Sequence, residues 1–172
     1  MLWVYIVGAA VVFLGVSAFF GAPYVPSRKR DLKKLFDEMA PITEKDVVLD
    51  FGSGDGLVLR EASRRGAKAV GYEIHPLFVA VARMLSRRDP RVIVRWVNAW
   101  RTPFPEDVTL VYAFSVGRDG RKLANKVLHE ASRLRRPIVL VCYGNPLPGR
   151  KHARKVGAYY GYRFDPLHSS EA

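Results

Sequence analysis

The most informative segment of the chain is residues 50–56, which read DFGSGDG. It completes the apolar run that begins at Val47, and residues 56–65 after it have a helical pattern. A short apolar run that ends in a glycine-rich turn before a helix predicts a buried strand, here residues 47–51, with a ligand-binding loop at its carboxyl end. Glycines in such a loop let the backbone turn tightly and approach a ligand closely.

Strand and helix patterns alternate through the rest of the chain. Strand patterns occupy residues 67–72, 91–97, 108–114 and 138–143, helical patterns occupy residues 77–88 and 118–134, and residues 158–164 are a candidate final strand. Strands that alternate with helices of this length predict a doubly wound, mostly parallel sheet, which is a Rossmann-like α/β fold.

The sequence of the loop distinguishes between two candidate classes of cofactor. A dinucleotide-binding loop needs G-x-G-x-x-G, but Leu57 stands at the last position and the third glycine is Gly56. The carboxylate of Asp55 would also repel a pyrophosphate. S-adenosylmethionine has no phosphate, and its ammonium and sulfonium charges are compatible with acidic groups near the loop. We therefore predict S-adenosylmethionine as the cofactor, and no metal.

Polar residues after the next two strands extend the predicted site. Glu73 follows residues 67–72, where a carboxylate can accept hydrogen bonds from both ribose hydroxyls. This position is shared with other nucleoside-binding folds, so it does not name the cofactor. Asn98 follows the third strand, where a polar side chain can reach the edge of an adenine. The alternative for Asn98 is a solvated loop residue.

These motifs resemble a known family. LDFGSGDG at residues 49–56 with GYEI at residues 71–74 resembles motif I and the acidic loop of class I S-adenosylmethionine-dependent methyltransferases. With PYVPS at residues 23–27, the pattern is similar to small protein-lysine methyltransferases. That group includes the mitochondrial enzymes that modify the ATP synthase c-subunit and the adenine nucleotide translocase, and small archaeal enzymes. The resemblance covers residues 22–115.

The resemblance implies lysine N-methylation and a set of site residues. The family often has Asp where this chain has Asn98, and a class I domain usually ends with two further strands, of which no complete pair is evident here. We therefore expect a C-terminally short methyltransferase domain over residues 47–172. The candidate cofactor-binding residues are Tyr24, Pro26, Ser27, Asp50, Gly52, Ser53, Gly54, Asp55, Gly56, Glu73, Ile74, Asn98, Ala99 and Trp100.

Three aromatic residues are candidates for the catalytic substrate channel. A lysine amine must lose its proton before methylation, and an apolar channel lowers its pKa by desolvation. Tyr24, Trp100 and Phe114 are the candidates, with the Tyr24 hydroxyl orienting the amine. Core packing is the alternative for Trp100 and Phe114. No residue stands out as a general base, and His75 is equally well interpreted as a turn residue.

The N-terminus predicts a membrane anchor. Residues 2–20 read LWVYIVGAAVVFLGVSAFF and have no charged side chain, which matches the ~20 residues that a spanning helix needs. We expect an anchor over residues 1–21, followed over residues 22–46 by the extended PYVPS segment and an amphipathic helix at 31–39. The alternatives are a cleaved signal peptide and a buried core helix, but no basic region, which a signal peptide needs, precedes the apolar stretch.

The basic residues set the expected orientation and partners. Lys and Arg number 28 against 16 Asp and Glu, a net charge of +12. Basic residues directly after the anchor place the domain on the cytoplasmic side of a cell membrane, or on the matrix side of the mitochondrial inner membrane in a eukaryote. The charge is compatible with an anionic lipid surface and with RNA. The single cysteine, Cys142, excludes an intramolecular disulfide.

Local sequence argues against a nucleic-acid substrate. Enzymes that methylate exocyclic base amines usually carry Asn/Asp-Pro-Pro-aromatic after the fourth strand, where residues 113–116 read AFSV. Cytosine C5 enzymes use a Pro-Cys pair, but Cys142 follows Val141. We therefore expect methylation of lysine on a membrane-associated protein. The alternatives are a membrane lipid or quinone, RNA, and a cofactor-binding membrane adaptor without activity.

Overall fold

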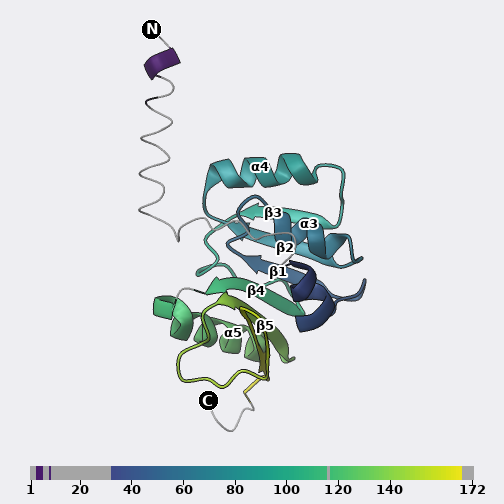
Figure 1. Cartoon of the computed structure of the whole chain (residues 1–172), viewed down its shortest axis with the longest axis vertical. Coiled ribbons are helices and arrows are strands. Elements are labelled where there is room, and N and C mark those ends of the chain that lie inside the picture. The colour runs from purple at the N-terminus through teal and green to yellow at the C-terminus, as the bar shows by residue number, and fades with distance from the viewer. Residues whose placement is uncertain (1–2, 6–7, 9–31, 116, 168–172) are drawn as a thin grey trace.

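A seven-stranded sheet forms the centre of the molecule, in the order β3-β2-β1-β4-β5-β7-β6 (Figure 1). The computed structural model describes residues 3–5, 8, 32–115 and 117–167. The strands are β1 (Val47–Phe51), β2 (Lys68–Glu73), β3 (Val92–Trp96), β4 (Leu110–Ser115), β5 (Ile138–Gly144), β6 (Arg154–Val156) and β7 (Tyr159–Phe164). Strands β1 to β5 are parallel, and β7 runs antiparallel to both β5 and β6.

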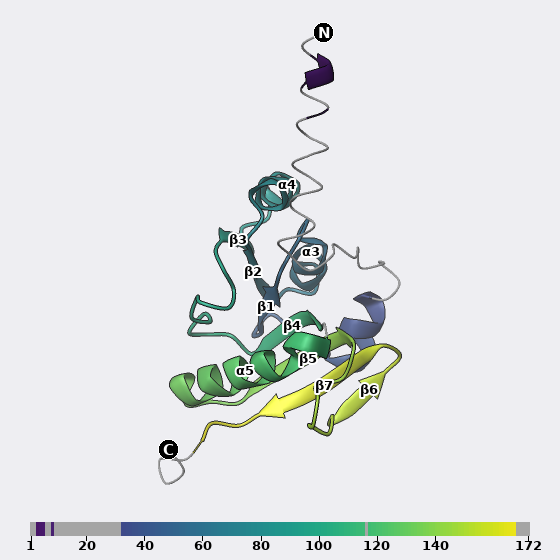
Figure 2. The same cartoon turned by 90° about the vertical axis from the view of Figure 1, so that its left-hand side faces the viewer.

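Helices cover both faces of this sheet (Figure 2). They are the π-helix η1 (Lys34–Met39), α3 (Leu57–Ser63), α4 (Pro76–Ser86), the 3-10 helix η2 (Gly117–Asp119) and α5 (Gly120–Leu134). Buried residues form two clusters, one under η1, α3 and α4 and the other under α5. Strand β1 supplies both, because Val48 packs in the first cluster while Val47 and Leu49 pack in the second. Burial on both faces is the reason for the continuous apolar run from Val47 to Leu49 in this strand.

The strand order fixes where a ligand binds. After β1 the chain builds β2 and β3 on one side, then returns to place β4 on the other side of β1. In open α/β sheets, ligands bind at the carboxyl ends of the strands where the order reverses, which is here between β1 and β4. The glycine-rich loop follows β1 at this position. The predicted mostly parallel, doubly wound sheet is confirmed.

The prediction of a C-terminally short domain is wrong. Strands β6 and β7 form the further pair, and β7 joins them to β5 from Ile138 to Tyr143. Strand β6 escaped the sequence analysis because it has three residues, RKV, without the alternation of apolar and polar residues that marks a longer strand. The predicted amphipathic helix is present as η1, which buries Leu35, Phe36 and Met39.

The predicted anchor, residues 1–21, and the PYVPS segment fall almost wholly outside the described residues. Residues 3–5 and 8 are helical and exposed. Within the described ranges, no helix has the length and apolar character that crossing a membrane requires.

Candidate active site

The loop after β1 is held against β2 by its backbone. The N–H groups of Gly52 and Ser53 donate to the carbonyl oxygen of Tyr72 at 2.9 and 3.0 Å. The three loop glycines have positive φ angles, +96° at Gly52, +50° at Gly54 and +76° at Gly56. L-residues with a side chain rarely adopt this region, so the loop requires glycine at these positions. At Gly52, a Cβ would meet nothing within 4 Å, so this part of the loop faces open space.

Ser53 packs inward. A Cβ placed on Gly71 of β2 would lie 2.5 Å from Ser53 Oγ and 2.6 Å from Leu59 Cδ1. The Ser53 hydroxyl is therefore wedged between β2 and α3, and it is buried without a hydrogen-bond partner among the described residues. Its side chain is directed toward the core, so we assign its contribution to the packing of the loop and to its backbone.

Glu73 joins the loops that follow β1 and β2. Its Oε2 accepts a hydrogen bond from Gly54 N–H and its Oε1 accepts one from His75 N–H, both at 2.8 Å. The residue is buried, with an exposed fraction of 8%. Each carboxylate oxygen has a second lone pair, so both remain able to accept a ribose hydroxyl. The geometry is compatible with the predicted ribose contact.

Acidic groups concentrate around the loop. Asp50 is buried at the end of β1, and its pKa is raised well above its ordinary value by burial first and then by the charges of Glu73 and Asp55. A cation bound at the loop would favour the ionised form of Asp50 and offset the repulsion among these carboxylates. The site therefore fits the ammonium and sulfonium groups of S-adenosylmethionine, and it does not fit a pyrophosphate.

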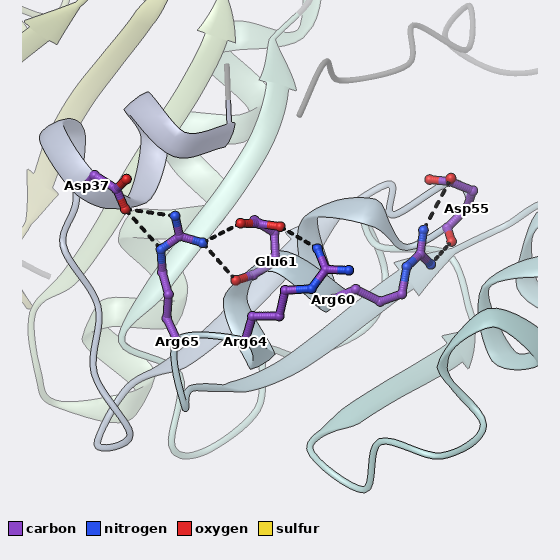
Figure 3. Close-up of polar contacts among 6 residues, drawn as sticks. All are labelled: Asp37, Asp55, Arg60, Glu61, Arg64 and Arg65. Carbon is purple, nitrogen blue, oxygen red and sulfur yellow. Dashed lines mark hydrogen bonds and ion pairs between the residues drawn. The ribbon is translucent and has the colours of Figure 1, made fainter. Parts of the chain in front are cut away.

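Arg60 holds the loop from α3 (Figure 3). Its Nη1 donates to the backbone oxygen of Asp55 at 2.6 Å, and its Nη2 lies 3.4 Å from Asp55 Oδ2. The other oxygen of Asp55 accepts the N–H of Leu57 at 3.1 Å, at the start of the helix. Arg60 was missed from the sequence. The available signal was a cation one helical turn beyond the last loop glycine.

Figure 3 shows the same helix continuing into a second set of ion pairs. Arg65 contacts Asp37 of η1 at 2.7 Å and Glu61 at 2.7 Å, and Glu61 also pairs with Arg64 at 2.7 Å. Burial alone would raise the pKa of Glu61, but its hydrogen bonds from Arg65 and Arg64 lower it overall. Helix α3 thus connects the glycine-rich loop at one end to η1 at the other.

The Asn98 side chain shapes its own turn. Its Oδ1 accepts the N–H of Trp100 at 2.9 Å, and its backbone oxygen accepts both the N–H and the hydroxyl of Thr102. The amide oxygen thus accepts one hydrogen bond within the loop, and its second lone pair can still accept a bond from the predicted adenine. We expect Asn98 to act by fixing Ala99 and Trp100, which are both half-buried. Ile74 is exposed directly after Glu73, and its backbone oxygen accepts the indole N–H of Trp96 at 2.9 Å.

The two described channel candidates belong to separate groups of aromatic rings. The Trp100 ring meets Phe51 edge-on, with centroids 4.7 Å apart, in the cluster under α5. The exposed Phe114 lies 5.9 Å from Tyr143, which packs in the cluster on the opposite face. The structure does not bring Trp100 and Phe114 together. The third candidate, Tyr24, lies outside the described residues, as do Pro26 and Ser27.

Two further residues at these rings were not predicted. Tyr143 on β5 lies beside Phe114 on β4 in the strand register. Its ring also contacts that of Tyr159, with centroids 4.9 Å apart. Lys122 of α5 places its Nζ 4.4 Å from the centre of the Trp100 ring. Tyr143 had a usable signal, because it stands at the carboxyl end of a predicted strand. Lys122 had none, since the packing of α5 on the loop is a tertiary contact.

The sequence pattern of the family described as methyltransferase domain matches residues 48–137, just over half of the 172 residues. The chain belongs to this family. S-adenosylmethionine is accordingly the cofactor of this methyltransferase, in agreement with the acidic, glycine-rich loop. In the part of the chain that the structure describes, no group of His, Cys, Asp or Glu is arranged to hold a metal ion.

Two curated relatives and one solved structure are similar to this methyltransferase. The lysine N-methyltransferase of the ATP synthase c-subunit from Xenopus laevis is 36% identical over 67 residues, which are 39% of this chain and 29% of the relative. Demethylmenaquinone methyltransferase of Tropheryma whipplei (strain Twist) is 33% identical over 69 residues, 40% of this chain and 28% of the relative. The matches thus span less than a third of these relatives.

The solved structure is an RNA methyltransferase from Salinibacter ruber in complex with S-adenosyl-L-homocysteine. It superimposes with a TM-score of 0.71 at 24% identity, covering 86% of this chain and 98% of that one. At this level of identity the likeness concerns the fold, and it agrees with the Rossmann-like sheet of this methyltransferase.

Proposed function

We propose that this methyltransferase transfers the methyl group of S-adenosylmethionine to lysine amines of a membrane-associated protein, on the cytoplasmic side of the membrane. The observation that carries the proposal is the similarity to the c-subunit lysine N-methyltransferase of Xenopus laevis, at 36% identity over 67 residues. The PYVPS segment at residues 23–27 supports the same group of enzymes, and the apolar stretch at residues 2–20 supports a site near a membrane.

The residues around the loop have distinct parts in this proposal. Bound S-adenosylmethionine supplies a methyl group on a positively charged sulfur. The buried Asp50 and Glu73 provide the negative potential that favours such a cation, and Glu73 also offers free lone pairs to the ribose. Arg60 fixes the loop backbone through the carbonyl of Asp55. These groups bind and orient the cofactor, so the chain needs few residues that exchange protons.

The aromatic group at the end of β4 is the proposed entry for the substrate amine. A free lysine has a pKa of about 10.4, so only its deprotonated fraction is nucleophilic at neutral pH. Phe114 is exposed beside Tyr143, and an amine that enters between such rings loses water and with it part of its preference for the charged form. The proton then leaves to solvent before transfer, in line with the absence of an evident base among the described candidates.

The test is incubation of the full chain with methyl-labelled S-adenosylmethionine and membranes from the source cell. Gly54→Arg is the control, because Gly54 has φ +50° in the loop and an arginine there would obstruct the cofactor. Label on protein, mapped to lysine by mass spectrometry and absent with the control variant, supports the proposal. Label on protein side chains other than lysine, or no labelled protein from a chain that binds the cofactor normally, overturns it.

A quinone or related membrane lipid is the second candidate substrate. The observation that favours it is the 33% identity over 69 residues with demethylmenaquinone methyltransferase of Tropheryma whipplei. Solvent extraction of the same reaction separates the two, because a methylated quinone partitions into the organic phase. Label in the organic phase with unlabelled protein would favour quinone methylation over lysine methylation. Label in RNA alone would exclude both lysine and quinone as the substrate.

A further inference from the structure

Helix α4 has two apolar faces. Val79, Ala82 and Ser86 face the sheet and are buried. On the opposite side, residues 77, 80, 81, 84 and 85 follow the spacing of a second stripe, and all five are apolar. The larger side chains point outward, since Leu77, Met84 and Leu85 have exposed fractions of 44, 56 and 50%. A surface helix of a soluble domain normally turns a polar face outward, so this face is suited to a partner that is apolar at contact.

The charges around this face have one predominant sign. Residues 74–88 contain no Asp or Glu, and Arg83, Arg87 and Arg88 lie in or directly after the second half of α4. All three are exposed. Arg83 donates to the backbone oxygen of Val94 at 2.9 and 3.1 Å, which fixes its position at the edge of β3. The nearest acid after the helix in sequence, Asp89, accepts a hydrogen bond from the hydroxyl of Ser63.

An exposed tryptophan extends the apolar face toward the active site. Trp96, at the end of β3, has an exposed fraction of 63%, while its indole N–H donates to the backbone oxygen of Ile74. Its ring is thus free to contact a partner without leaving a buried donor unpaired. Ile74 is itself exposed and directly follows Glu73, so the apolar face continues from α4 to the cofactor loops.

We infer that the outer face of α4, together with Trp96 and Ile74, rests on the surface of an anionic lipid bilayer. Large apolar side chains beside arginines, with no acidic residue among them, are the pattern of a helix that lies in the interface of such a membrane. The arginines match anionic head groups, and an exposed indole is favoured at that depth. An RNA partner would match the charge but leave Leu77, Met84 and Leu85 unused.

The arrangement of the molecule agrees with this contact. In both views α4 is the outermost helix at one end of the domain, with its outer side directed away from the sheet (Figures 1 and 2). The membrane would therefore lie beside the loops after β2 and β3, next to Glu73 and Trp96. This orientation of the domain on the membrane does not depend on which methyl acceptor is correct.

The test uses a fluorescent probe on the full chain. Met84→Cys takes an environment-sensitive label, because the native Cys142 is buried, and Arg163→Cys on the exposed side of β7 is the matched control. Both variants are reconstituted into vesicles of phosphatidylcholine alone or with about a third phosphatidylglycerol. We expect the label at position 84, and not at 163, to shift to shorter wavelength and brighten several-fold when phosphatidylglycerol is present.

A charge variant completes the test. Arg87→Glu with Arg88→Glu in the Met84→Cys background is expected to abolish most of the spectral shift. Sedimentation of the vesicles should show that this variant remains bound to them. A label at position 84 that stays water-exposed on anionic vesicles overturns the inference. So does a shift of equal size without anionic lipid, or one that appears without vesicles and grows with protein concentration, which would indicate a second copy on this face.

Discussion

At the scale of a single residue, we expect the buried carboxylate of Asp50 to favour cofactor binding and to destabilise the fold when no cofactor is bound. Its pKa is raised by burial, and further by Glu73 and Asp55, because the ionised form lacks water and faces two like charges. A carboxyl whose pKa is higher in the folded than in the unfolded state destabilises the fold as pH rises from the unfolded pKa through the folded one. The full penalty is present above that range, where a bound cation offsets it.

We predict that Asp50→Asn raises the melting temperature of the free protein at neutral pH and weakens S-adenosylmethionine binding at least about tenfold, or ~1.4 kcal/mol. In the natural chain, binding of the cation should release a proton from the fraction of Asp50 that is protonated, so affinity rises with pH across the raised pKa. Calorimetry in buffers of different ionisation enthalpy measures that proton. A pH dependence unchanged in Asp50→Asn would contradict this assignment.

At Gly71 the constraint is space. Its missing Cβ leaves room for the Ser53 hydroxymethyl group and for Leu59, each within 2.7 Å of where that carbon would lie. We predict that Gly71→Ala lowers the free energy of unfolding by about 1–3 kcal/mol, because the loop must move away from β2. Cofactor affinity should fall with it. Chemical denaturation measures the first effect and calorimetry the second.

Gly117→Ala is the matched control for that substitution. A Cβ at Gly117 would meet nothing within 4 Å, and the residue is exposed before α5. It should leave both quantities within the ordinary range for a surface change, roughly 0.5 kcal/mol. Equal effects at the two glycines would show that the loop tolerates displacement.

At the scale of an element, α3 holds the glycine-rich loop in place through the contacts of Arg60. Arg60 contacts the carbonyl of Asp55, whereas Arg64, one turn further on, pairs with Glu61 on the surface. We predict that Arg60→Ala raises the KM for S-adenosylmethionine about tenfold with a smaller change in kcat, because it loosens a binding loop. Arg64→Ala, a loss of the same side chain directly after the same helix, should change neither. Arg60→Lys should recover part of the affinity through a single hydrogen bond.

The elements differ in how far their sequences predicted them. Strand β1 and the DFGSGDG loop were predicted because burial on both faces and the glycine requirement leave local marks. Strand β6 left none, since it is held by its register with β7 from Arg154 to Val156. The same limit applies to the site. Glu73 was predicted from its place after a strand, but its bonds to Gly54 and His75 depend on two loops meeting in space.

At the scale of the whole molecule, one face of the sheet carries a loop in place of a helix. Residues 97–109 connect β3 to β4 through turns, and they bury Phe104 against the strands. Arg133 of α5 donates to the backbone oxygen of Phe104 at 2.8 Å and pairs with Glu106 and with the buried Glu130. Lys126 completes this group at 2.8 Å from Glu130. The Asn98–Trp100 segment of the site belongs to this loop.

We predict that Glu130→Ala destabilises the fold by about 3–5 kcal/mol, because it leaves Lys126 and Arg133 without their buried partner. Burial alone would raise the pKa of Glu130, but bonds from Lys126 and Arg133 lower it overall. Stability from a carboxylate with a lowered pKa is complete above the unfolded pKa of about 4.3 and is lost as pH falls through the folded value. Denaturation between neutral and acidic pH should show a larger loss in the natural chain than in Glu130→Ala, which keeps the contribution of Glu61. His129→Ala, at an exposed neighbouring position, is the control.

The ends of the strand order, β3 and β6, decide how this chain behaves in a crowded solution. An open sheet has two strands with unpaired backbone groups, which can template the addition of another chain and start aggregation. Here β6 has only three residues, of which Arg154 and Lys155 are exposed, and β3 ends in Arg95 and Trp96. The short, cationic border at β6 repels a second copy of itself. The most basic strand of the sheet, β6, therefore also protects its edge against self-association through fibril-like strand pairing.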